Sequence, residues 1–414
     1  MKKLVALLLA LTLCIGLCAC GATAEKPAEE TPATTGETET PATDAKDIKV
    51  GFIFLHYENS TYDLNFIDAA KAAAAELGLS DDQIMMKTNI AESQACYDAA
   101  AELVDAGCDL VITDSFGHES FALAAAKEFP EVQFVSCTGV KAHTEGLSNF
   151  HNAFASIYEG RYLAGVAAGL KLNEMIENGD ITAEEAKMGY VGAYPYAEVK
   201  SGYTSFFLGA RSICPSVTME VTFTSSWYDE ALEKEAANKL INNGCVLISQ
   251  HADSMGAPTA CETAGVPNVS YNGSTVAACP NTFIVSSRID WTPFFVYAIN
   301  CVASGEDIGY DWTGTLATGS VVLTDVNEQA AAAGTVEKIA EVMKALEDGS
   351  VKVFDTATFT VNGETVTTYL ADVDDLGDYV GETEAVSDGA FLEAYYRSAP
   401  YFDLDIDGIT NLDA

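Results

Sequence analysis

Residues 109–136 read DLVITDSFGHESFALAAAKEFPEVQFVS, and this stretch decides the fold class. The short apolar runs at its two ends, 109–113 and 132–136, have the length of buried strands. The alanine-rich stretch between them has the spacing of an amphipathic helix. A strand, a helix and a second strand in this order form a parallel pair with a right-handed crossover, and such a sheet needs helices on both faces. The stretch therefore predicts an α/β protein.

The same alternation continues on both sides of this unit. A long helix that carries YEGRYLAGVAAGL (158–170) separates two series of strands. The predicted strands are 48–54, 84–90, 109–113 and 132–136 in the first series, and 187–193, 217–224, 245–249 and 268–271 in the second. Two such series in tandem predict two Rossmann-like lobes with parallel sheets, joined by a hinge.

The remaining elements should complete the two lobes. We expect the strand at 282–290 and the helix at 291–304 to belong to the first lobe. To the second lobe we assign a strand at 321–325, a helix at 334–347 and a hairpin at 359–366. Asn362 and Gly363 favour a type I′ turn in that hairpin. The predicted N-terminal lobe is 48–155 plus 275–320, and the predicted C-terminal lobe is 156–274 plus 321–414.

The chain begins with MKKLVALLLALTLCIGLCACG, where two lysines precede an apolar run too short for a membrane span. Residues 1–19 are predicted to be an export signal. Its end resembles the bacterial lipobox, whose last cysteine is acylated, so Cys20 is the predicted lipid anchor. Residues 20–47 contain no large apolar side chain, which predicts a disordered stalk. We therefore expect a protein held on the extracytoplasmic face of the cell membrane by its lipid alone.

The charge of the chain excludes one class of partner. The formal net charge is −40 at pH 7, and such a surface repels nucleic acids. Only four arginines are present, which argues against a ligand that needs several bidentate phosphate contacts. An uncharged or cationic small ligand fits better.

The cysteines that follow the predicted anchor do not form a metal-binding pattern. They are Cys96, Cys108, Cys137, Cys214, Cys245, Cys261, Cys279 and Cys301. None of them has C-x-x-C spacing, and most interrupt apolar runs as small buried side chains do. We expect no structural zinc, while one or two disulfides remain open at this stage.

Aromatic and polar side chains follow nearly every predicted strand. In open α/β sheets, ligands bind beyond the carboxyl ends of the strands. The candidate ligand-binding residues at these positions are Tyr62, Asp114, Ser115, Phe116, Tyr194, Tyr196, Trp227, His251, Asp253 and Asn272. Aromatic faces stack on flat rings, and carboxylates or amides bind the ring edges, so a hydrogen-bonding heterocycle is the expected ligand. A sugar ring can be stacked in the same way.

Other interpretations of these residues stay open. Asp253 or Ser254, and likewise Asp114 or Ser115, could cap the helix that follows. Trp227 could pack within its lobe. His251 has no second histidine three to five residues away, which argues against zinc, and no nucleophile motif accompanies it and Asp253, which argues against catalysis.

Several of these strings resemble the basic membrane protein family. They are TDSFGHESFALAAAKEFPEVQF (113–134), YEGRYLAGVAAG (158–169), GYVGAYPYAEVKSGYTSFFLGARS (189–212), SSWYDEALEKEAANKLINNGC (225–245) and SQHADS (249–254). The resemblance covers roughly residues 48–350 and implies a type I periplasmic-binding-protein fold. It also implies a lipid-anchored receptor for purine nucleosides or nucleobases that serves an ABC importer.

The resemblance also bears on single residues. Where the related branch has Gly-Trp-Thr-Tyr in the first loop, this chain has NSTY (59–62), so one stacking tryptophan is missing. Nucleoside-binding members hold the ribose with an aspartate and a lysine, at positions that correspond to Asn272 and Asp290. The resemblance thus implies Asp290 as a further site residue, and the missing lysine favours a free purine base over a nucleoside.

These observations lead to one expected function. We expect a monomeric, non-enzymatic receptor, without cofactor or metal, that binds a purine-like ligand and delivers it to an ABC permease. Tyr62, Phe116 and Trp227 would stack on or wall the ring. Asp253, Asn272 and Asp114 would bind its edge, with Tyr194 and Tyr196 completing the wall of the second lobe. A receptor for riboflavin, a sugar or an autoinducer, or a sensor ectodomain, is the alternative.

Overall fold

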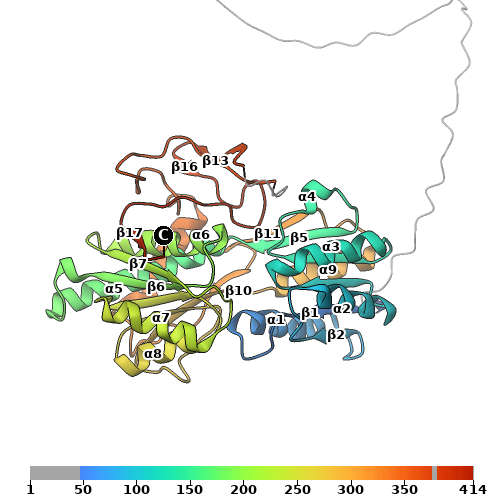
Figure 1. Cartoon of the computed structure of the whole chain (residues 1–414), viewed down its shortest axis with the longest axis horizontal. Coiled ribbons are helices and arrows are strands. Elements are labelled where there is room, and N and C mark those ends of the chain that lie inside the picture. The colour runs from blue at the N-terminus through green and yellow to red at the C-terminus, as the bar shows by residue number, and fades with distance from the viewer. Residues whose placement is uncertain (1–46, 375–379, 414) are drawn as a thin grey trace, which may run out of the picture. The chain divides into compact units, whose positions relative to one another are not determined.

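The structure is a computed structural model that describes residues 47–374 and 380–413. The predicted export signal, the Cys20 anchor and nearly all of the predicted stalk lie outside the described residues. The described part contains two sheets built mainly of parallel strands, each with helices on both faces (Figure 1). The α/β class and the two parallel sheets predicted from the sequence are therefore confirmed.

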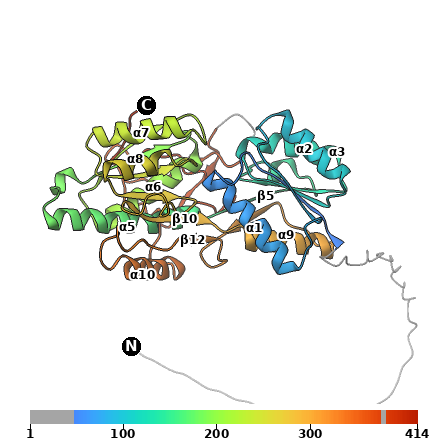
Figure 2. The ribbon, with the colours of Figure 1, turned by 90° about the horizontal axis from the view of Figure 1, so that it is seen from below.

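The first sheet has six strands, all parallel, in the order β11-β5-β4-β3-β1-β2. Its strands are β1 (Val50–Ile53), β2 (Ile84–Lys87), β3 (Leu110–Thr113), β4 (Gln133–Cys137), β5 (Phe150–Ala155) and β11 (Asp311–Gly314). Its helices are α1 (Thr61–Leu77), α2 (Gln94–Asp105), the short 3-10 helix η2 (Phe116–His118), α3 (Glu119–Glu128), α4 (Ala142–Glu145) and α9 (Thr292–Ser304). Figure 2 shows α2 and α3 on one face of this sheet and α1 and α9 on the other.

The second sheet has seven strands in the order β12-β10-β9-β8-β6-β7-β17, and β12 alone runs antiparallel to its neighbour. Its strands are β6 (Lys187–Gly192), β7 (Thr218–Phe223), β8 (Leu247–His251), β9 (Asn268–Tyr271), β10 (Phe283–Ile289), β12 (Val321–Leu323) and β17 (Ile409–Asn411). Its helices are α5 (Ile157–Asn178), α6 (Ala197–Ile213), α7 (Glu230–Asn242), α8 (Gly256–Ala264) and α10 (Thr335–Glu347), and the 3-10 helix η3 (Ala183–Glu185) precedes β6. No helix among the described residues is both long enough and apolar enough to cross a membrane.

One predicted strand lies in the wrong lobe. The strand expected at 282–290 in the first lobe is β10, which pairs with β9 and β12 in the second sheet. Its apolar run is typical of a buried strand but carries no information about which sheet it joins. The strand that completes the first sheet is β11, whose sequence DWTG is too short and too polar to be recognised. The following helix α9 packs on α1 in the first lobe, as expected.

The chain crosses between the lobes three times, between β5 and α5, between β10 and α9, and between β11 and β12. Hydrogen bonds join these crossings to one another. The amide of Ser156 donates to the carbonyl of Gly314 at 2.8 Å, and the amide of Asp290 donates to Ser320 at 2.7 Å. Three short adjacent segments of this kind form a hinge of the type that lets two lobes close on a ligand.

The region after α10 packs onto the second lobe with little regular structure. It contains the short strands β13 (Leu370–Ala371), β14 (Thr383–Glu384), β15 (Val386–Ser387) and β16 (Ala390–Phe391). The predicted turn at Asn362 and Gly363 is present, because both residues have positive φ and Val361 pairs with Glu364 across it. Phe402 stacks on Phe354 with ring centroids 4.4 Å apart, which places an aromatic cluster under this region.

The eight described cysteines are all buried and all carry free thiols. They occupy the cores as small apolar side chains, as the sequence pattern predicted. The disulfides that remained open at the sequence level are absent from the described residues.

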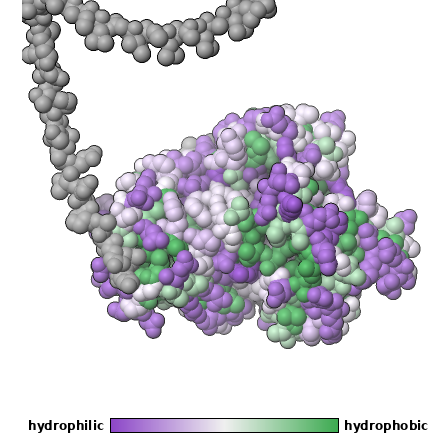
Figure 3. Space-filling view, turned by 180° about the vertical axis from the view of Figure 1, so that it is seen from behind, coloured by the Kyte–Doolittle hydropathy of each residue, from purple (hydrophilic) through white to green (hydrophobic). Residues whose placement is uncertain are grey.

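The surface shows the polar character that the composition predicts. Viewed from behind, hydrophilic residues cover much of the molecule, with hydrophobic patches between them (Figure 3). Together with the net charge of −40, such a surface disfavours contact with polyanions.

Helices α5 and α6 approach each other closely through glycines. A methyl group at Gly165 would overlap the carbonyl oxygen of Phe206, and one at Gly169 would lie 2.5 Å from the carbonyl oxygen of Ala210. A side chain at either position would force the two backbones apart. The glycine spacing in YEGRYLAGVAAG therefore serves helix packing.

We expect Gly165→Ala to lower the free energy of unfolding by about 1–3 kcal/mol, because the added methyl overpacks the α5–α6 contact. Chemical denaturation measures the change. Glu177→Ala, at an exposed position of the same helix, is the control and should cost less than about 0.5 kcal/mol. Equal effects of the two substitutions would contradict the close approach of the helices.

Candidate functional site

A cavity of about 400 Å³ lies where the carboxyl ends of the two sheets face each other. Its wall contains eight of the residues predicted from the sequence, namely Tyr62, Ser115, Phe116, Tyr196, Trp227, His251, Asp253 and Asn272. They come from the segments that follow β1, β3, β6, β7, β8 and β9, with His251 as the last residue of β8. The structure therefore brings together loops that the strand-end rule predicted to converge.

Three predicted site residues lie outside the cavity wall. Asp114 is fully buried behind it, and one of its carboxylate oxygens accepts a hydrogen bond from the amide of Leu55 at 3.1 Å. Tyr194 stacks on Tyr196. Asp290 accepts a hydrogen bond from the amide of Thr292 at 3.0 Å, just before α9. These three residues support the site from a distance in this conformation.

The two lobes touch each other beside the cavity. The amide of Thr61 donates to the carbonyl oxygen of Asp253 at 3.1 Å, and the side-chain amide of Asn65 donates to the carbonyl oxygen of Asn272 at 3.0 Å. Ring contacts cross the cleft as well, since Phe116 lies 5.8 Å from Tyr196. The conformation is thus a closed one, in which α1 is bound to the loops that carry the candidate ligand residues.

An aromatic group forms the wall on the side of the second lobe. Tyr194 and Tyr196 stack with centroids 5.1 Å apart and an interplanar angle of 12°. The edge of Trp227 meets Tyr194 at 5.1 Å. Because these rings fix one another, Tyr196 and Trp227 present a rigid apolar surface to the cavity. Trp227 therefore both packs within its lobe and lines the cavity.

Asp253 places a buried carboxyl group in the cavity wall, and burial favours its neutral form. Burial raises the pKa of Asp253 well above its usual range, and the charges of Asp63, Glu233 and Glu198 add to the shift. The side-chain amide of Asn272 donates to this carboxyl group at 3.3 Å. A protonated carboxyl group offers one O–H donor and one acceptor, which suits the edge of a heterocycle that also has both.

The loop after β1 is held by a second carboxyl group, Asp63. It accepts hydrogen bonds from the amide of His56 at 2.6 Å and from the hydroxyl of Ser60 at 2.6 Å. Burial favours a higher pKa for Asp63, but hydrogen bonds with His56, Asp114 and Ser60 outweigh burial and lower it. Burial and the nearby Asp63 raise the pKa of Asp114 well above its usual range. Asp63 is therefore ionised and Asp114 is protonated. This pair of carboxyl groups holds the loop after β1 in place on the first-lobe side of the cavity.

His251 is paired within the second lobe. Its Nε2 lies 2.9 Å from a carboxylate oxygen of Glu198, and its ring lies 4.5 Å from that of Tyr271. Gly202 leaves the space that this ring occupies, because a Cβ there would lie 2.9 Å from Nδ1 of His251. His251 thus has a carboxylate partner, and no cluster of metal-binding side chains among the described residues includes it.

The hydrogen bonds of Ser254, Asp253 and Ser115 show which of these residues cap the helix that follows. The hydroxyl of Ser254 accepts a hydrogen bond from the amide of Gly256 at 3.0 Å, so Ser254 stabilises the turn into α8. Asp253 makes no such contact and faces the cavity. The hydroxyl of Ser115 donates to Glu92 and does not cap the helical turn that follows it.

Two residues of the cavity wall have an unusual backbone conformation. Thr138 has φ 64° and Asn272 has φ 65°, both in the left-handed region. For a β-branched residue such as Thr138 this conformation is uncommon and costs free energy. Strained residues of this kind concentrate at ligand sites, where the surrounding structure holds them in place.

The sequence analysis missed a large part of the cavity wall. His56, Asp63 and Glu198 lie beside predicted residues and escaped notice because their neighbours carried the aromatic signal. The C-terminal region contributes Tyr369, Leu370, Asp372, Gly381, Arg397, Ala399, Pro400, Tyr401 and Asp403. No strand-end pattern marks these residues, because they lie in irregular structure far along the chain.

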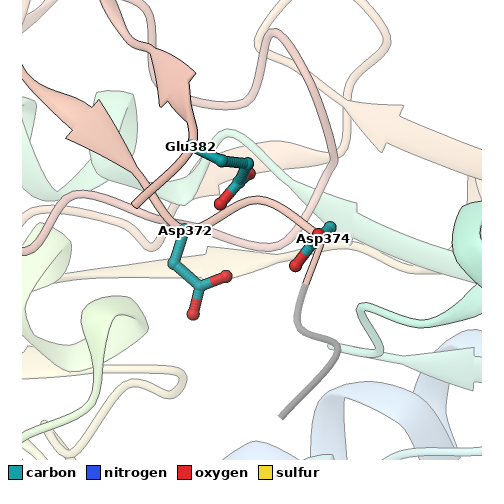
Figure 4. A group of neighbouring side chains, drawn as sticks. All are labelled: Asp372, Asp374 and Glu382. Atoms are coloured by element: carbon teal, nitrogen blue, oxygen red, sulfur yellow. The ribbon is translucent and has the colours of Figure 1, made fainter. Parts of the chain in front are cut away.

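One group of carboxylates in the C-terminal region lies close together. Asp372, Asp374 and Glu382 each place an oxygen within 4.8 Å of the others (Figure 4). They lie next to the paired strands β13 and β14. Exposed acidic groups of this kind are common without an ion, and nothing further at this position indicates one.

Sequence comparisons relate the chain to transport proteins. Residues 57–353 match the family model described as ABC transporter substrate-binding protein, PnrA-like. The chain is 30% identical over 261 residues to a purine-binding protein of Brucella abortus, which covers 62% of this chain and 69% of that protein. It is 31% identical over 217 residues to a putative ABC transporter glucose-binding protein of Haloferax volcanii, covering 52% of each chain.

Solved structures share the fold. A solute-binding protein of an ABC transporter from Aeropyrum pernix aligns with a TM-score of 0.62 at 18% identity, over 74% of this chain and 93% of that one. A second, from Conexibacter woesei, aligns with a TM-score of 0.58 at 19% identity, over 74% and 98%. These likenesses confirm the two-lobed binding-protein fold.

A buried acid beneath the Asp253 loop generates a prediction about pH. Burial raises the pKa of Glu233 to about 7, although it accepts hydrogen bonds from the amides of Asp229 and Ser254. A carboxyl group whose pKa is raised in the folded state stabilises the fold at low pH, and this contribution is lost as the pH rises through about 7. Glu233→Gln should therefore raise the melting temperature at pH 8 by roughly 3–5 °C and change it little at pH 5.

Thermal unfolding of the ligand-free protein from pH 5 to pH 8 measures this difference. Glu235→Gln removes the same charge from an exposed position of α7 and is the matched control. If both variants shift the melting temperature equally at pH 8, general charge repulsion and not the burial of Glu233 is the cause.

Proposed function

Because the chain belongs to the PnrA-like family of ABC transporter substrate-binding proteins, we propose that its cavity captures a purine base for import. Proteins of this family bind a small molecule outside the cytoplasm for a membrane permease and are not enzymes. We propose further that the chain acts as a monomer and is held at the membrane by a lipid on Cys20.

The buried carboxyl group of Asp253 beside an aromatic wall is the observation that carries the purine assignment. A purine base has two flat faces for the rings of Tyr196 and Trp227, and its edge alternates donors and acceptors. The protonated Asp253 and the amide of Asn272 supply the complementary groups. The purine-binding relative in Brucella abortus supports the same ligand class.

A free base fits the wall better than a nucleoside. No lysine is among the residues that line the described cavity, so no ammonium group is present to hold ribose hydroxyls. Asn272 uses its side-chain amide on Asp253, and Asp290 lies away from the cavity. Of the two positions that the sequence resemblance connects with ribose, Asp290 is therefore unsuited to that role.

A sugar is the second candidate. Aromatic rings such as Tyr196 and Trp227 also stack on pyranose rings, and a relative in Haloferax volcanii is named as a putative glucose-binding protein. Riboflavin or an autoinducer would need the same aromatic wall. The neutral Asp253 favours the purine, because it is matched to a ring edge with both a donor and an acceptor.

Closure couples the ligand to the permease. In the closed conformation, Thr61 and Asn65 of α1 bind the carbonyl oxygens of Asp253 and Asn272. A ligand held by the side chains of the same two residues stabilises the closed form over the open one. This difference in free energy between the closed and open forms allows a permease to distinguish a loaded receptor from an empty one.

A thermal-shift screen tests the ligand class. The full chain, purified in detergent, is heated with adenine, guanine, hypoxanthine, xanthine, their nucleosides, riboflavin and common sugars. A ligand at a thousandfold excess over its Kd stabilises the protein by about 4 kcal/mol, which is easily detected. A base that shifts the melting temperature more than its nucleoside supports the proposal. A response to sugars or riboflavin alone would refute the purine assignment and leave the receptor function intact.

We expect Asp253→Ala to weaken purine binding at least tenfold and to leave the melting temperature of the ligand-free protein nearly unchanged. The reason is that the buried carboxyl group is neutral and faces the cavity. Ser254→Ala is the matched control, since it removes the turn hydrogen bond next to it and should lower the melting temperature but not the affinity. Calorimetric titration and thermal unfolding measure the two effects. A large loss of stability in Asp253→Ala would identify that residue as structural.

A further inference from the structure

The wall of the cavity extends beyond the part of the chain that matches the family. The family match ends at residue 353, whereas the cavity wall includes residues between 369 and 403. In Figure 1 this C-terminal segment lies over α6 and reaches toward β11. The segment thus adds to the binding site something that the family match alone does not contain.

The C-terminal segment is firmly attached to both lobes. In the second lobe, Lys200 binds the carboxylates of Asp403 at 2.7 Å and Asp405 at 3.0 Å. In the first lobe, the carboxylate of Asp311 accepts a hydrogen bond from the amide of Ser398 at 2.6 Å. The part of the segment around residues 398–405 is therefore held by both lobes, and the residue beside Ser398 has a defined place.

That residue is Arg397, which lines the cavity. Its Nε, Nη1 and Nη2 donate to the carbonyl oxygens of Ala399, Val373 and Pro400 at 3.1, 3.0 and 3.2 Å. A guanidinium group has five N–H groups, so one remains on each terminal nitrogen. Among the described residues, no carboxylate lies within 4.0 Å of this guanidinium. Three hydrogen bonds hold the group in place, and one N–H on each terminal nitrogen is not used by them.

A pair of guanidinium donors selects a particular ring edge. It binds two neighbouring acceptors, such as O6 and N7 of a 6-oxopurine, and it clashes with the amino group that adenine has in place of O6. We propose that Arg397 contacts the ligand and makes the site selective for 6-oxopurines over 6-aminopurines. This inference rests on the proposed purine function and names the purine class.

The selectivity is not a consequence of the other polar groups. Asp253 in its protonated form and Asn272 each offer a donor and an acceptor, so they can satisfy either class of purine. Arg397 offers donors only. It is therefore the residue of the described wall whose donors favour an oxo group over an amino group, whereas an ionised carboxylate such as that of Asp63 offers acceptors only.

The test compares the Kd values of hypoxanthine and adenine, measured by calorimetric titration on the full chain in detergent. We expect the wild type to bind hypoxanthine about 10- to 100-fold more tightly, the range that a good bidentate pair provides. Arg397→Gln and Arg397→Lys should both bring this ratio to within about threefold. Lysine keeps the charge but cannot form the paired contact.

Arg211→Gln is the matched control. Arg211 also donates to carbonyl groups of the C-terminal region, those of Thr358 and Asp407, but it does not line the cavity. Its loss should loosen the segment and leave the ratio of Kd values unchanged. If Arg211→Gln abolishes the selectivity as Arg397→Gln does, the role of Arg397 is structural and the proposal fails.

Variation of the ligand tests the same contact without changing the protein. 7-Deazahypoxanthine lacks the N7 acceptor and should bind to the wild type about tenfold more weakly than hypoxanthine does. To the Arg397→Gln variant, the two ligands should bind with equal Kd values. Equal wild-type Kd values for hypoxanthine, its deaza analogue and adenine would overturn the proposal while leaving purine capture in place. If no purine binds at all, the proposed function itself fails, and the two failures are thereby distinguished.

Discussion

Two main-chain carbonyl groups, those of Asp253 and Asn272, hold the molecule in its closed form. They accept hydrogen bonds from Thr61 and Asn65 at the start of α1, across the cleft. Their side chains form part of the cavity wall, so the same loop residues serve the contact between the lobes and the contact with the ligand. Any displacement of these loops therefore changes closure and binding together. The left-handed backbone of Asn272 belongs to the same constraint, because it turns the chain so that one residue can do both.

Much of this arrangement could be predicted from local sequence patterns. Alternating strands and helices define the two lobes, and parallel strands bring their carboxyl ends to one edge, so residues such as Trp227 and His251 lie in the cavity wall as the strand-end rule predicts. Side-chain direction is harder to predict. Asp114 and Asp253 both follow buried strands, yet Asp114 points behind the wall and Asp253 lines the cavity. The partners of β10 and the position of Arg397 depend on contacts between residues far apart in the chain, and no local period encodes such contacts.

The acidic residues around the site have pKa values that are shifted in opposite directions. Hydrogen bonds lower the pKa of Asp63, whereas burial raises the pKa values of Asp114 and Asp253 and favours their neutral forms. The cavity of a protein with a net charge of −40 can therefore present neutral hydrogen-bonding groups to a neutral ligand.

The edge strand β17 sets the order in which the binding site can be built. Residues 409–411 pair with residues 219–221 of β7. The second sheet therefore contains a contact between two segments that lie far apart in the sequence. Five strands of the first sheet lie before residue 156, whereas β17 and the wall that carries Arg397 come from the last part of the chain. Contacts of such long sequence separation slow folding. The cavity wall is therefore complete only when residues near the end of the chain have folded onto the second lobe.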